Sequence, residues 1–428
     1  MPEEPETTGA SGRNPLLLLL LLYSALVTAA LVALLPYYLD VTRENRSFSS
    51  SPPVTYPEPL IIWLYGTESE MVHTILPFFQ RAYRQYEVRV VPKTWSSPAA
   101  VDLVALPPDL WPDLIQIGST WLPELADKDL ILPLDPYLSH SFIEASDFAK
   151  NSWSLYRYRN HQYAIPWYID VRALYYRSDL LPSPPKTWNE VLRLRRTRSR
   201  KYRYPLTFAL DDPKNFLMLY WAAGGTLSRP DPLVLKKSLK RYKQLLLSRI
   251  VPSGPFENTR DPEAVLASGY CAAMISGPWH LRALEREFPQ VSDSWATAPL
   301  PADSTTVSFL GGAGWAIPKH AKNPEGAWTF IEYMTHVERQ KEWWRAVGNL
   351  PAVQAAWDSS IETNPHLAGF AAMLSHLRHP PVDPRWNETE REWKNILDDY
   401  TSGKITLTRA RTEMLRSLKW LRSNNSNL

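Results

Sequence analysis

Apolar residues follow strand and helix spacings in turn through the first folded part of the chain. A short apolar run at 60–65 predicts a strand, and the polar stretch 66–70 predicts a turn. Residues 71–86 have the period of an amphipathic helix, and 88–91 is the next predicted strand. The apolar side of this helix would consist of Val72, Ile75, Leu76, Phe79 and Tyr83.

The alternation of strands and helices continues along the chain. A strand is predicted at 113–117, and the order of strand and helix continues through 121–138. An alternating aromatic strand is predicted at 171–177, inside a second α/β region at 170–308. This order predicts an α/β protein with parallel strands, whose ligand-binding loops follow the carboxyl ends of the strands.

A glycine-rich stretch near residue 312 feeds a strand and then a helix. The strand is predicted at 315–317, and Asn323 and Pro324 cap and open the helix. Glycines permit a close approach of another chain segment or of a ligand, so a crossing point or a ligand contact is predicted here. The glycines are Gly311, Gly312 and Gly314.

Two further helix signals are local. Thr187 and Glu190 form a predicted capping box. Residues 387–428 predict two helices interrupted at Ser402 and Gly403.

The amino terminus differs in pattern from the rest. Residues 1–14 are polar, 15–36 are apolar and long enough to cross a bilayer, and 37–59 form a Ser/Pro-rich linker. An uncleaved transmembrane helix at 15–36 is favoured over a cleaved signal, because the apolar run is long and the cleavage site is poor.

The amino-acid composition limits the classes of function that the chain can have. The chain has 428 residues, which suggests two or three domains. Its formal net charge of +3 gives no reason to expect a nucleic-acid partner. A single cysteine, Cys271, excludes intrachain disulfides and cysteine-rich metal sites. Eighteen tryptophans exceed what packing requires and indicate a ligand surface.

No enzyme motif is present. The chain has no Gly-x-Ser-x-Gly, phosphate loop or His-Glu-x-x-His sequence, so we expect no enzyme, cofactor or bound metal. A glycosidase stays open as an alternative, because the spacing of its two carboxylates is spatial and not sequential.

Eight motifs occur in the order seen in one known family. They are Ile61–Glu68, Pro112–Trp121, Leu132–Asp135, Tyr163-Ala-Ile-Pro166, Pro185-Lys-Thr-Trp188, Gly277-Pro-Trp279, the 309–334 stretch with Gly348–Pro351 behind it, and Trp393–Thr406. On these motifs, residues 60–420 resemble the extracellular solute-binding proteins of ABC importers. The resemblance is to the sugar-binding family that includes the maltose-binding protein.

The resemblance implies a two-lobed periplasmic-binding-protein fold of the type II-like class, with a ligand cleft between lobes that close by hinge motion. Lobe 1 would be 60–166 plus 310–360, lobe 2 would be 167–308, and 361–428 would form helices spanning both. Two features depart from the family. No lipid-anchor cysteine follows the apolar segment, and the Gly66 turn lacks the Asp-Lys pair of the maltose-binding protein.

Candidate ligand residues combine flat aromatic rings with hydrogen-bonding groups, as a sugar requires. Trp279 matches a stacking position of the family. Core packing is the alternative for each tryptophan, and Trp63 is expected in the core. A helix-end or hinge role is the alternative for Glu68 and Asp170. Trp167 and Tyr168 face opposite sides of an extended segment, so at most one should reach the cleft. The full candidate set is Glu68, Ser119, Thr120, Trp121, Trp167, Asp170, Trp221, Trp279, Gly312 and Trp386.

The predicted function is capture of a carbohydrate and its delivery to ABC permease subunits. The predicted location is the cell membrane, held through residues 16–35, with the large domain outside the cytoplasm in the periplasm or at the cell surface. The alternatives are binding of another solute, such as a polyamine, glycerol phosphate or peptide, and a ligand-sensing module for a membrane partner.

Overall fold

The computed structural model describes residues 58–95, 98–194, 201–209, 212–248, 250–251, 261–357 and 363–420. The predicted membrane span at 15–36 and almost all of the linker lie outside these residues. Within the described residues, no helix has the length and apolar character needed to cross a bilayer.

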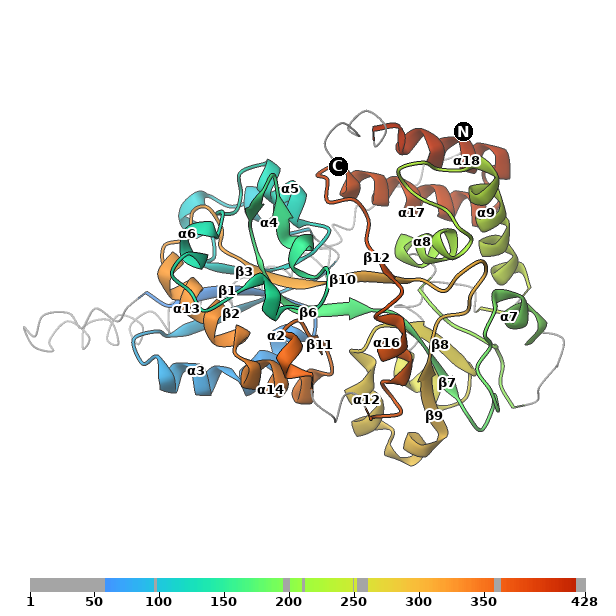
Figure 1. Cartoon of the computed structure of the whole chain (residues 1–428), viewed down its shortest axis with the longest axis horizontal. Coiled ribbons are helices and arrows are strands. Elements are labelled where there is room, and N and C mark those ends of the chain that lie inside the picture. The colour runs from blue at the N-terminus through green and yellow to red at the C-terminus, as the bar shows by residue number, and fades with distance from the viewer. Residues whose placement is uncertain are drawn as a thin grey trace, which may run out of the picture. The chain divides into compact units, whose positions relative to one another are not determined.

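The larger sheet has seven strands (Figure 1). Its order is β11-β6-β10-β3-β1-β2, and β12 pairs with β10. Strand β1 runs parallel to both β2 and β3, whereas β10 runs antiparallel to β3 and β6. The strands are β1 (Leu60–Tyr65), β2 (Val88–Lys93), β3 (Leu114–Gly118), β6 (Ile165–Val171), β10 (Ser308–Ala316), β11 (Leu350–Pro351) and β12 (Leu377–Arg378).

Strand β1 forms over the predicted residues and shows why they form a central strand. Its alternate side chains enter two separate cores, one on each face of the sheet. Ile62 and Leu64 pack in the core that contains Phe79 of helix α3 (Leu76–Ala82), and Trp63 and Tyr65 pack in the core that contains Leu103 and Leu125. Trp63 is therefore a core residue, as expected.

The smaller sheet is antiparallel, with the order β8-β7-β9. Its strands are β7 (Ala173–Arg177), β8 (Ala273–Ser276) and β9 (Trp295–Ala298). Arg172 alone separates β6 of the larger sheet from β7 of the smaller sheet. The single strand predicted at 171–177 is therefore wrong in its bounds, because the chain passes from one sheet to the other at Arg172. A separate two-stranded hairpin joins β4 (Arg157–Tyr158) to β5 (His161–Gln162).

The helices associate with one sheet or the other (Figure 1). Those near the larger sheet are α2 (Glu68–Met71), α3 (Leu76–Ala82), α4 (Ala99–Val104), α5 (Leu122–Asp127), α6 (Asp135–Leu138), α13 (Pro324–Thr335) and α14 (Val337–Val347). Those near the smaller sheet are α7 (Trp188–Leu194), α12 (His280–Glu287) and α16 (Ala368–Met373). Helix α11 (Pro262–Ala267) packs on α12, and α8 (Pro213–Ala222) packs on α9 (Pro232–Leu247) and contacts β10.

The helix predicted at 71–86 is wrong in its bounds. It is divided into α2, a 3₁₀ turn at Val72–Thr74, and α3. Pro77 lies in the first turn of α3 and has no N–H for a preceding helical turn, so the helix restarts there. Helix α2 also begins inside the predicted polar turn.

Local capping signals account for other helix ends. The Asn323 side chain accepts a hydrogen bond from Gly326 N at 2.8 Å, which confirms the predicted start of α13. Thr187 Oγ1 accepts from Glu190 N at 3.2 Å, but Glu190 Oε2 accepts from Lys186 N at 2.7 Å. The first bond of the predicted capping box is present, while the Glu190 carboxylate bonds the amide of the residue before the cap.

The carboxyl-terminal helices are α17 (Trp386–Ser402) and α18 (Leu407–Ser417). The break between them is at Gly403, whose φ of 86° is a left-handed conformation, as predicted for a glycine helix end. They pack against each other and against α9. Asn387 Nδ2 of α17 donates to Glu124 Oε2 of α5 at 2.8 Å, so α17 also contacts a helix of the larger sheet.

Glycines allow β10 to pass close to β6, as predicted for a crossing strand. Gly312 has a φ of 142°, and a Cβ at this position would lie 2.1 Å from Tyr168 O. A Cβ at Gly314 would lie 2.9 Å from Ile165 O. Both contacts are shorter than a side chain tolerates, so backbone occupies the space a side chain would need.

Candidate functional site

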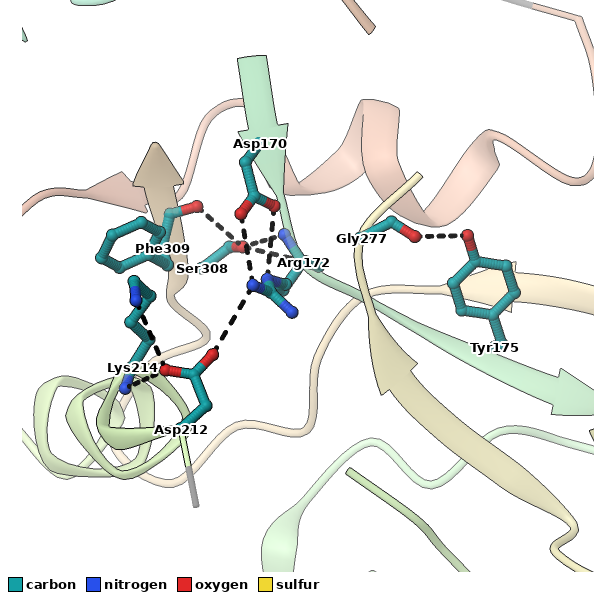
Figure 2. Close-up of polar contacts among 8 residues, drawn as sticks. All are labelled: Asp170, Arg172, Tyr175, Asp212, Lys214, Gly277, Ser308 and Phe309. Carbon is teal, nitrogen blue, oxygen red and sulfur yellow. Dashed lines mark hydrogen bonds and ion pairs between the residues drawn. The ribbon is translucent and has the colours of Figure 1, made fainter. Parts of the chain in front are cut away.

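The passage from β6 to β7 is fixed to β10 at one point. Arg172 N donates to Ser308 Oγ at 2.7 Å, and the Ser308 hydroxyl donates to Arg172 O at 2.9 Å (Figure 2). Both main-chain groups of Arg172 are thereby paired with the first residue of β10. The Arg172 side chain is held at the junction of the two sheets.

A network of five charged side chains surrounds this junction. Arg172 Nη2 donates to Asp170 Oδ2 at 3.2 Å and lies 3.7 Å from Asp212 Oδ2 (Figure 2). Lys214 Nζ lies 3.5 Å from Asp212 Oδ1 and 2.9 Å from Glu390 Oε1. Three carboxylates therefore face two cations. We name Asp170, Arg172, Asp212, Lys214 and Glu390 the junction network.

The local sequence positions each member of the junction network. Asp170 and Arg172 are two residues apart at the end of β6, so their side chains lie on the same side of the extended chain. Asp212 caps α8 by accepting from Lys214 N at 3.0 Å, and Pro213 opens the helix. Glu390 comes from the first turns of α17.

Burial and charge together set the pKa values of the junction network. Burial raises the pKa of Asp170, against the opposing attraction of Arg172 and Lys214. For Asp212, burial acts upward, but the attraction of Lys214 and Arg172 outweighs it and the pKa is lowered. The pKa of Lys214 is raised by Asp212 and Glu390 despite burial. The network thus offers hydrogen-bond donors and acceptors in a partly desolvated place.

Trp279 lies beside the junction network. It precedes α12, is partly exposed, and its ring centroid is 4.7 Å from the Arg172 guanidinium carbon. A Cβ at Gly277 would lie 1.9 Å from the Trp279 ring, so the ring folds over Gly277 and a side chain there would displace it. The Tyr175 hydroxyl donates to Gly277 O at 2.7 Å and fixes this turn (Figure 2).

The next residue supports Trp279 from the other side. His280 Nδ1 is hydrogen-bonded to Glu263 Oε1, and its ring centroid is 5.6 Å from that of Trp279. Burial acts to raise the pKa of Glu263, but the bond to His280 outweighs it and the pKa is lowered to about 2. The start of α12 is therefore bonded to α11 through a partly buried carboxylate and imidazole pair.

Several predicted residues lie instead at the end of β3. Trp121 is partly exposed, and its ring is 5.1 Å from that of Tyr65. Ser119 N donates to Gly312 O at 3.1 Å, which joins this strand end to β10. Thr120 lies between Ser119 and Trp121 and is partly exposed. The structure brings Ser119, Trp121 and Gly312 together, and Gly311, next to Gly312, pairs with Asp170 of the junction network.

Glu68 is a buried residue of α2. Its Oε1 accepts from the Tyr168 hydroxyl at 2.7 Å and from Asn349 Nδ2 at 3.1 Å. Burial raises the pKa of its carboxyl, against these hydrogen bonds. Two of its bonding positions are already used inside the protein, so its ligand contact stays a prediction. Tyr168, 6% exposed, shares this internal network.

Trp167, Trp221 and Trp386 are in the core, with 0%, 3% and 2% of their surfaces exposed. The Trp167 ring lies between those of Trp315 and Trp343, with centroid distances of 4.2 and 4.5 Å. Core packing was the alternative for these tryptophans. Their ligand contact stays a prediction for which the structure offers no exposed ring face.

Sequence reasoning missed Trp95 and most of the junction network. Of its five members, the sequence indicated only Asp170. The sequence Asp212-Pro213 is a helix-start signal that could have identified Asp212. Arg172 could have been noticed as a charged residue within the predicted aromatic strand 171–177. Glu390, however, is 178 positions from Asp212 and carries no local signal. Among the described residues, no group of three or more His, Cys, Asp or Glu residues is placed to hold a metal ion.

Comparison with known proteins places this chain in context. The family described as bacterial extracellular solute-binding protein matches residues 78–369. The maltotriose-binding protein of Pyrococcus abyssi is 22% identical over 349 residues, 74% of this chain and 73% of that protein. The maltooligosaccharide ABC transporter solute-binding lipoprotein of Streptococcus pneumoniae serotype 4 is 26% identical over 285 residues, 60% of this chain and 65% of that protein.

The fold is also found among solved structures. The sugar-binding protein MalE of Xanthomonas citri superposes with a TM-score of 0.73 at 24% identity, over 86% of this chain and 98% of that chain. This likeness confirms the predicted two-lobed periplasmic-binding-protein fold with mixed α/β content.

Proposed function

This chain belongs to the family of bacterial extracellular solute-binding proteins, and from that premise we propose that it binds a carbohydrate outside the cytoplasm and delivers it to an ABC importer. Proteins of this family bind solutes and are not enzymes. Two curated relatives carry names that specify maltotriose and maltooligosaccharides, and one of them names an ABC transporter. Those names support the solute class and the partner proposed here.

The observation that carries the proposal is the position of Trp279 beside the junction network. A sugar has apolar C–H faces and a ring of hydroxyl groups. The partly exposed Trp279 ring suits the first, and the carboxylates and guanidinium around Arg172 suit the second. Hydrogen bonds to ionised groups are stronger than neutral ones, so hydroxyl groups bound at Asp170 and Arg172 would fix the orientation of the sugar.

The lobes assigned from the sequence fit this proposal. The ligand would lie between a first lobe of 60–166 plus 310–360 and a second lobe of 167–308, with 361–428 associated with both. Asp170 and Arg172 then sit at the passage between the lobes, so a ligand bound there contacts the segment that moves on closure. We further propose that residues 15–36 anchor the domain to the outer side of the membrane.

A panel of mono- and oligosaccharides tests the carbohydrate proposal. A cognate sugar at 100 times its Kd should stabilise the folded protein by about 2.7 kcal/mol and raise its Tm. Calorimetry on the same sugars should give saturable heat. A panel that gives neither a Tm shift nor heat would reject carbohydrate binding, and a shift with a polyamine or glycerol phosphate instead would reassign the solute.

Trp279→Ala tests the site. The substitution should weaken sugar binding about tenfold or more, because the stacking face is lost, with little change in Tm without sugar. Trp153→Ala is the matched control, since Trp153 is another partly exposed tryptophan and packs on Phe148, with 5.0 Å between the ring centroids. Equal affinity of the Trp279→Ala variant and the unsubstituted protein would remove Trp279 from the site.

Import is tested separately from binding. Deletion of the gene should abolish uptake of the labelled cognate sugar, and a binding-defective Trp279→Ala chain should fail to restore it. Normal uptake in the deletion strain would contradict delivery to an importer while leaving carbohydrate binding intact.

A further inference from the structure

Helix α9 carries five cationic side chains and no acidic one. Its inner side is apolar, since Leu235, Leu239, Tyr242 and Leu245 are buried and hold the helix to the rest of the protein. The cations are therefore gathered on the other sides of the helix, which face solvent or the neighbouring helices. The solvent-facing side of α9 is strongly basic.

Three lysines and two leucines of α9 share one outward face. Leu233, Lys236, Lys237, Lys240 and Leu247 are all exposed, and they recur at the spacing of residues on the same side of a helix. Leu233 and Leu247, near the two ends of the helix, are 72% and 69% exposed. The face therefore has a basic centre with an apolar side chain at each end. We name these five residues the α9 stripe.

The lysines of the α9 stripe differ in their partners. Lys237 Nζ lies 2.8 Å from Asp303 Oδ2, so its charge is balanced within the protein. Lys236 and Lys240 form no ion pair with a carboxylate of the residues that the structure describes. The charges of these two lysines are therefore available to an anionic partner.

The neighbouring helices decide how far the positive surface extends. Helix α18, which packs against α9, has three arginines and one glutamate, and Arg409 pairs with that glutamate, Glu413, at 2.8 Å. Helix α17, which contacts both, instead exposes Glu388, Glu392 and Asp398. The excess of positive charge is therefore carried by α9 and α18, which lie side by side (Figure 1), and α17 limits it.

The surface of a bilayer with anionic lipids matches the α9 stripe in charge and in shape. Lipid phosphates are spread over a plane, and each lysine beside such a surface strengthens binding about fivefold. Exposed apolar residues next to lysines are typical of helices that lie at a membrane interface, where the apolar side chains enter the boundary below the headgroups. A soluble anionic partner would leave Leu233 and Leu247 unexplained.

The sequence keeps α9 within reach of a bilayer. Residues 37–57 separate the predicted membrane span from the first described residue. At 3.3–3.6 Å per residue, a chain of this length extends to roughly 70 Å at most. An anchor at 15–36 therefore permits the domain to lie with α9 against the same membrane.

We propose that the α9 stripe binds the membrane surface, with Lys236 and Lys240 against anionic phospholipid headgroups and with Leu233 and Leu247 entering the layer below them. This inference rests on the proposed location of the domain beside a membrane, outside the cytoplasm, and is independent of the solute that is bound. Contact through α9 gives the domain one orientation relative to the bilayer in which the importer subunits lie.

The full chain in lipid vesicles tests this contact. Gln244 is exposed on the outward side of α9, and Gln244→Cys provides a site for an environment-sensitive dye. Cys271 is fully buried, and burial raises the pKa of its thiol to about 12, so it does not take the label. The dye should sense lipid in vesicles of roughly two parts phosphatidylcholine to one part phosphatidylglycerol. It should sense none in pure phosphatidylcholine, and raising the NaCl concentration from about 0.1 M to about 1 M should abolish the signal by screening the charges.

Neutralising the two unpaired lysines should remove most of the contact. The variant Lys236→Gln/Lys240→Gln should lower the ratio of docked to undocked chain about 25-fold, which is about fivefold for each charge. The matched control is Lys150→Gln/Lys322→Gln, which removes two exposed lysines from other parts of the protein and should leave the signal unchanged. A dye at Phe78→Cys, another exposed position, on α3, should sense no lipid in either kind of vesicle.

The remaining outcomes separate the α9 contact from the anchor. Equal dye signals in the two kinds of vesicle, or equal losses for the α9 variant and its control, would reject the α9 contact and leave the anchor intact. A chain that floats only with anionic vesicles and is released by salt would reject the anchor and support the α9 contact. A chain that floats with neither would reject both. A dye signal that rises with the number of chains per vesicle and not with anionic lipid would assign this face to self-association, against lipid binding.

Discussion

Two groups of tryptophans in this protein show what the same side chain does in different places. Trp167, Trp315 and Trp343 stack on one another and are at most 1% exposed. Trp95 and Trp279 are exposed in part, and each follows the end of a strand. The stacked group joins β6, β10 and α14, whereas the exposed pair sits where a ligand can approach.

The two groups of tryptophans also differ in the surroundings of their indole nitrogens. Nε1 of Trp167, Trp315 and Trp343 is buried and has no hydrogen-bond partner among the described residues. Leaving such a donor unpaired costs about 1–3 kcal/mol, so these residues stabilise the fold through ring burial in spite of their polar atom. A tryptophan used in this way is part of the scaffold of the crossing strands.

Removing a ring from the stack should have the largest effect on stability. Trp167→Ala should lower the free energy of unfolding by about 3–5 kcal/mol, because it leaves a large cavity between two other rings. Urea unfolding followed by circular dichroism measures this change. Trp279→Ala, measured alongside, should fall well below it; equal losses for the two variants would erase the distinction between scaffold and ligand tryptophans.

The close crossing of β10 and β6 that the stack supports can be tested at Gly312. Gly312→Ala should cost roughly 2–3 kcal/mol, because the new Cβ meets Tyr168 O and the positive φ is strained for alanine. Gly224→Ala is the matched control, since Gly224 also has a positive φ, of 93°, but nothing lies within 4 Å of its Cβ position. A similar cost at both glycines would show that φ alone matters and that the close crossing does not.

Lowering the pH should weaken the support of Trp279 and leave the stacked tryptophans unchanged. Its effect on the free energy of unfolding should be smaller than that of the two substitutions above. The pKa of Glu263 is lowered to about 2, so its bond to His280 stabilises the folded protein fully above the ordinary pKa of 4.5, and this contribution is lost as the pH falls toward 2. The loss should be on the order of 1–2 kcal/mol.

The comparison is between the unsubstituted protein and Glu263→Gln. Unfolding free energies measured from pH 6 to pH 2.5 should fall less steeply for the variant, and sugar binding through Trp279 should become less sensitive to acid. Parallel pH profiles for the two proteins would show that the Glu263–His280 pair does not support Trp279.

Local signals allowed much of the fold to be predicted. The strand at 60–65, the cap at Asn323 and the break at Gly403 each depend on a few neighbouring residues, and each is confirmed. Pro77 was a local signal that the helix predicted at 71–86 is divided, but the regular spacing of apolar residues led to the prediction of one continuous helix. The passage of the chain between sheets at Arg172 had none, because an extended strand looks the same in either sheet.

The site was less predictable than the fold. The exposed position of Trp279 follows from a turn that its own sequence specifies. In contrast, Trp167 was a plausible ligand residue by type and is enclosed only because β10 and α14 cover it. The junction network draws Arg172 from the passage between β6 and β7, Asp212 from the start of α8 and Glu390 from α17, so its composition depends on tertiary structure.

The Ser308 hydroxyl, which bonds both main-chain groups of Arg172, fixes β10 to the passage between β6 and β7 at one point. Two chain segments that are bonded at one point can rotate about that point but cannot slide past each other. Any rearrangement of the two sheets that keeps these bonds is therefore a rotation, and the arc that a side chain sweeps grows with its distance from Ser308. Arg172, whose main chain these bonds hold, then moves least.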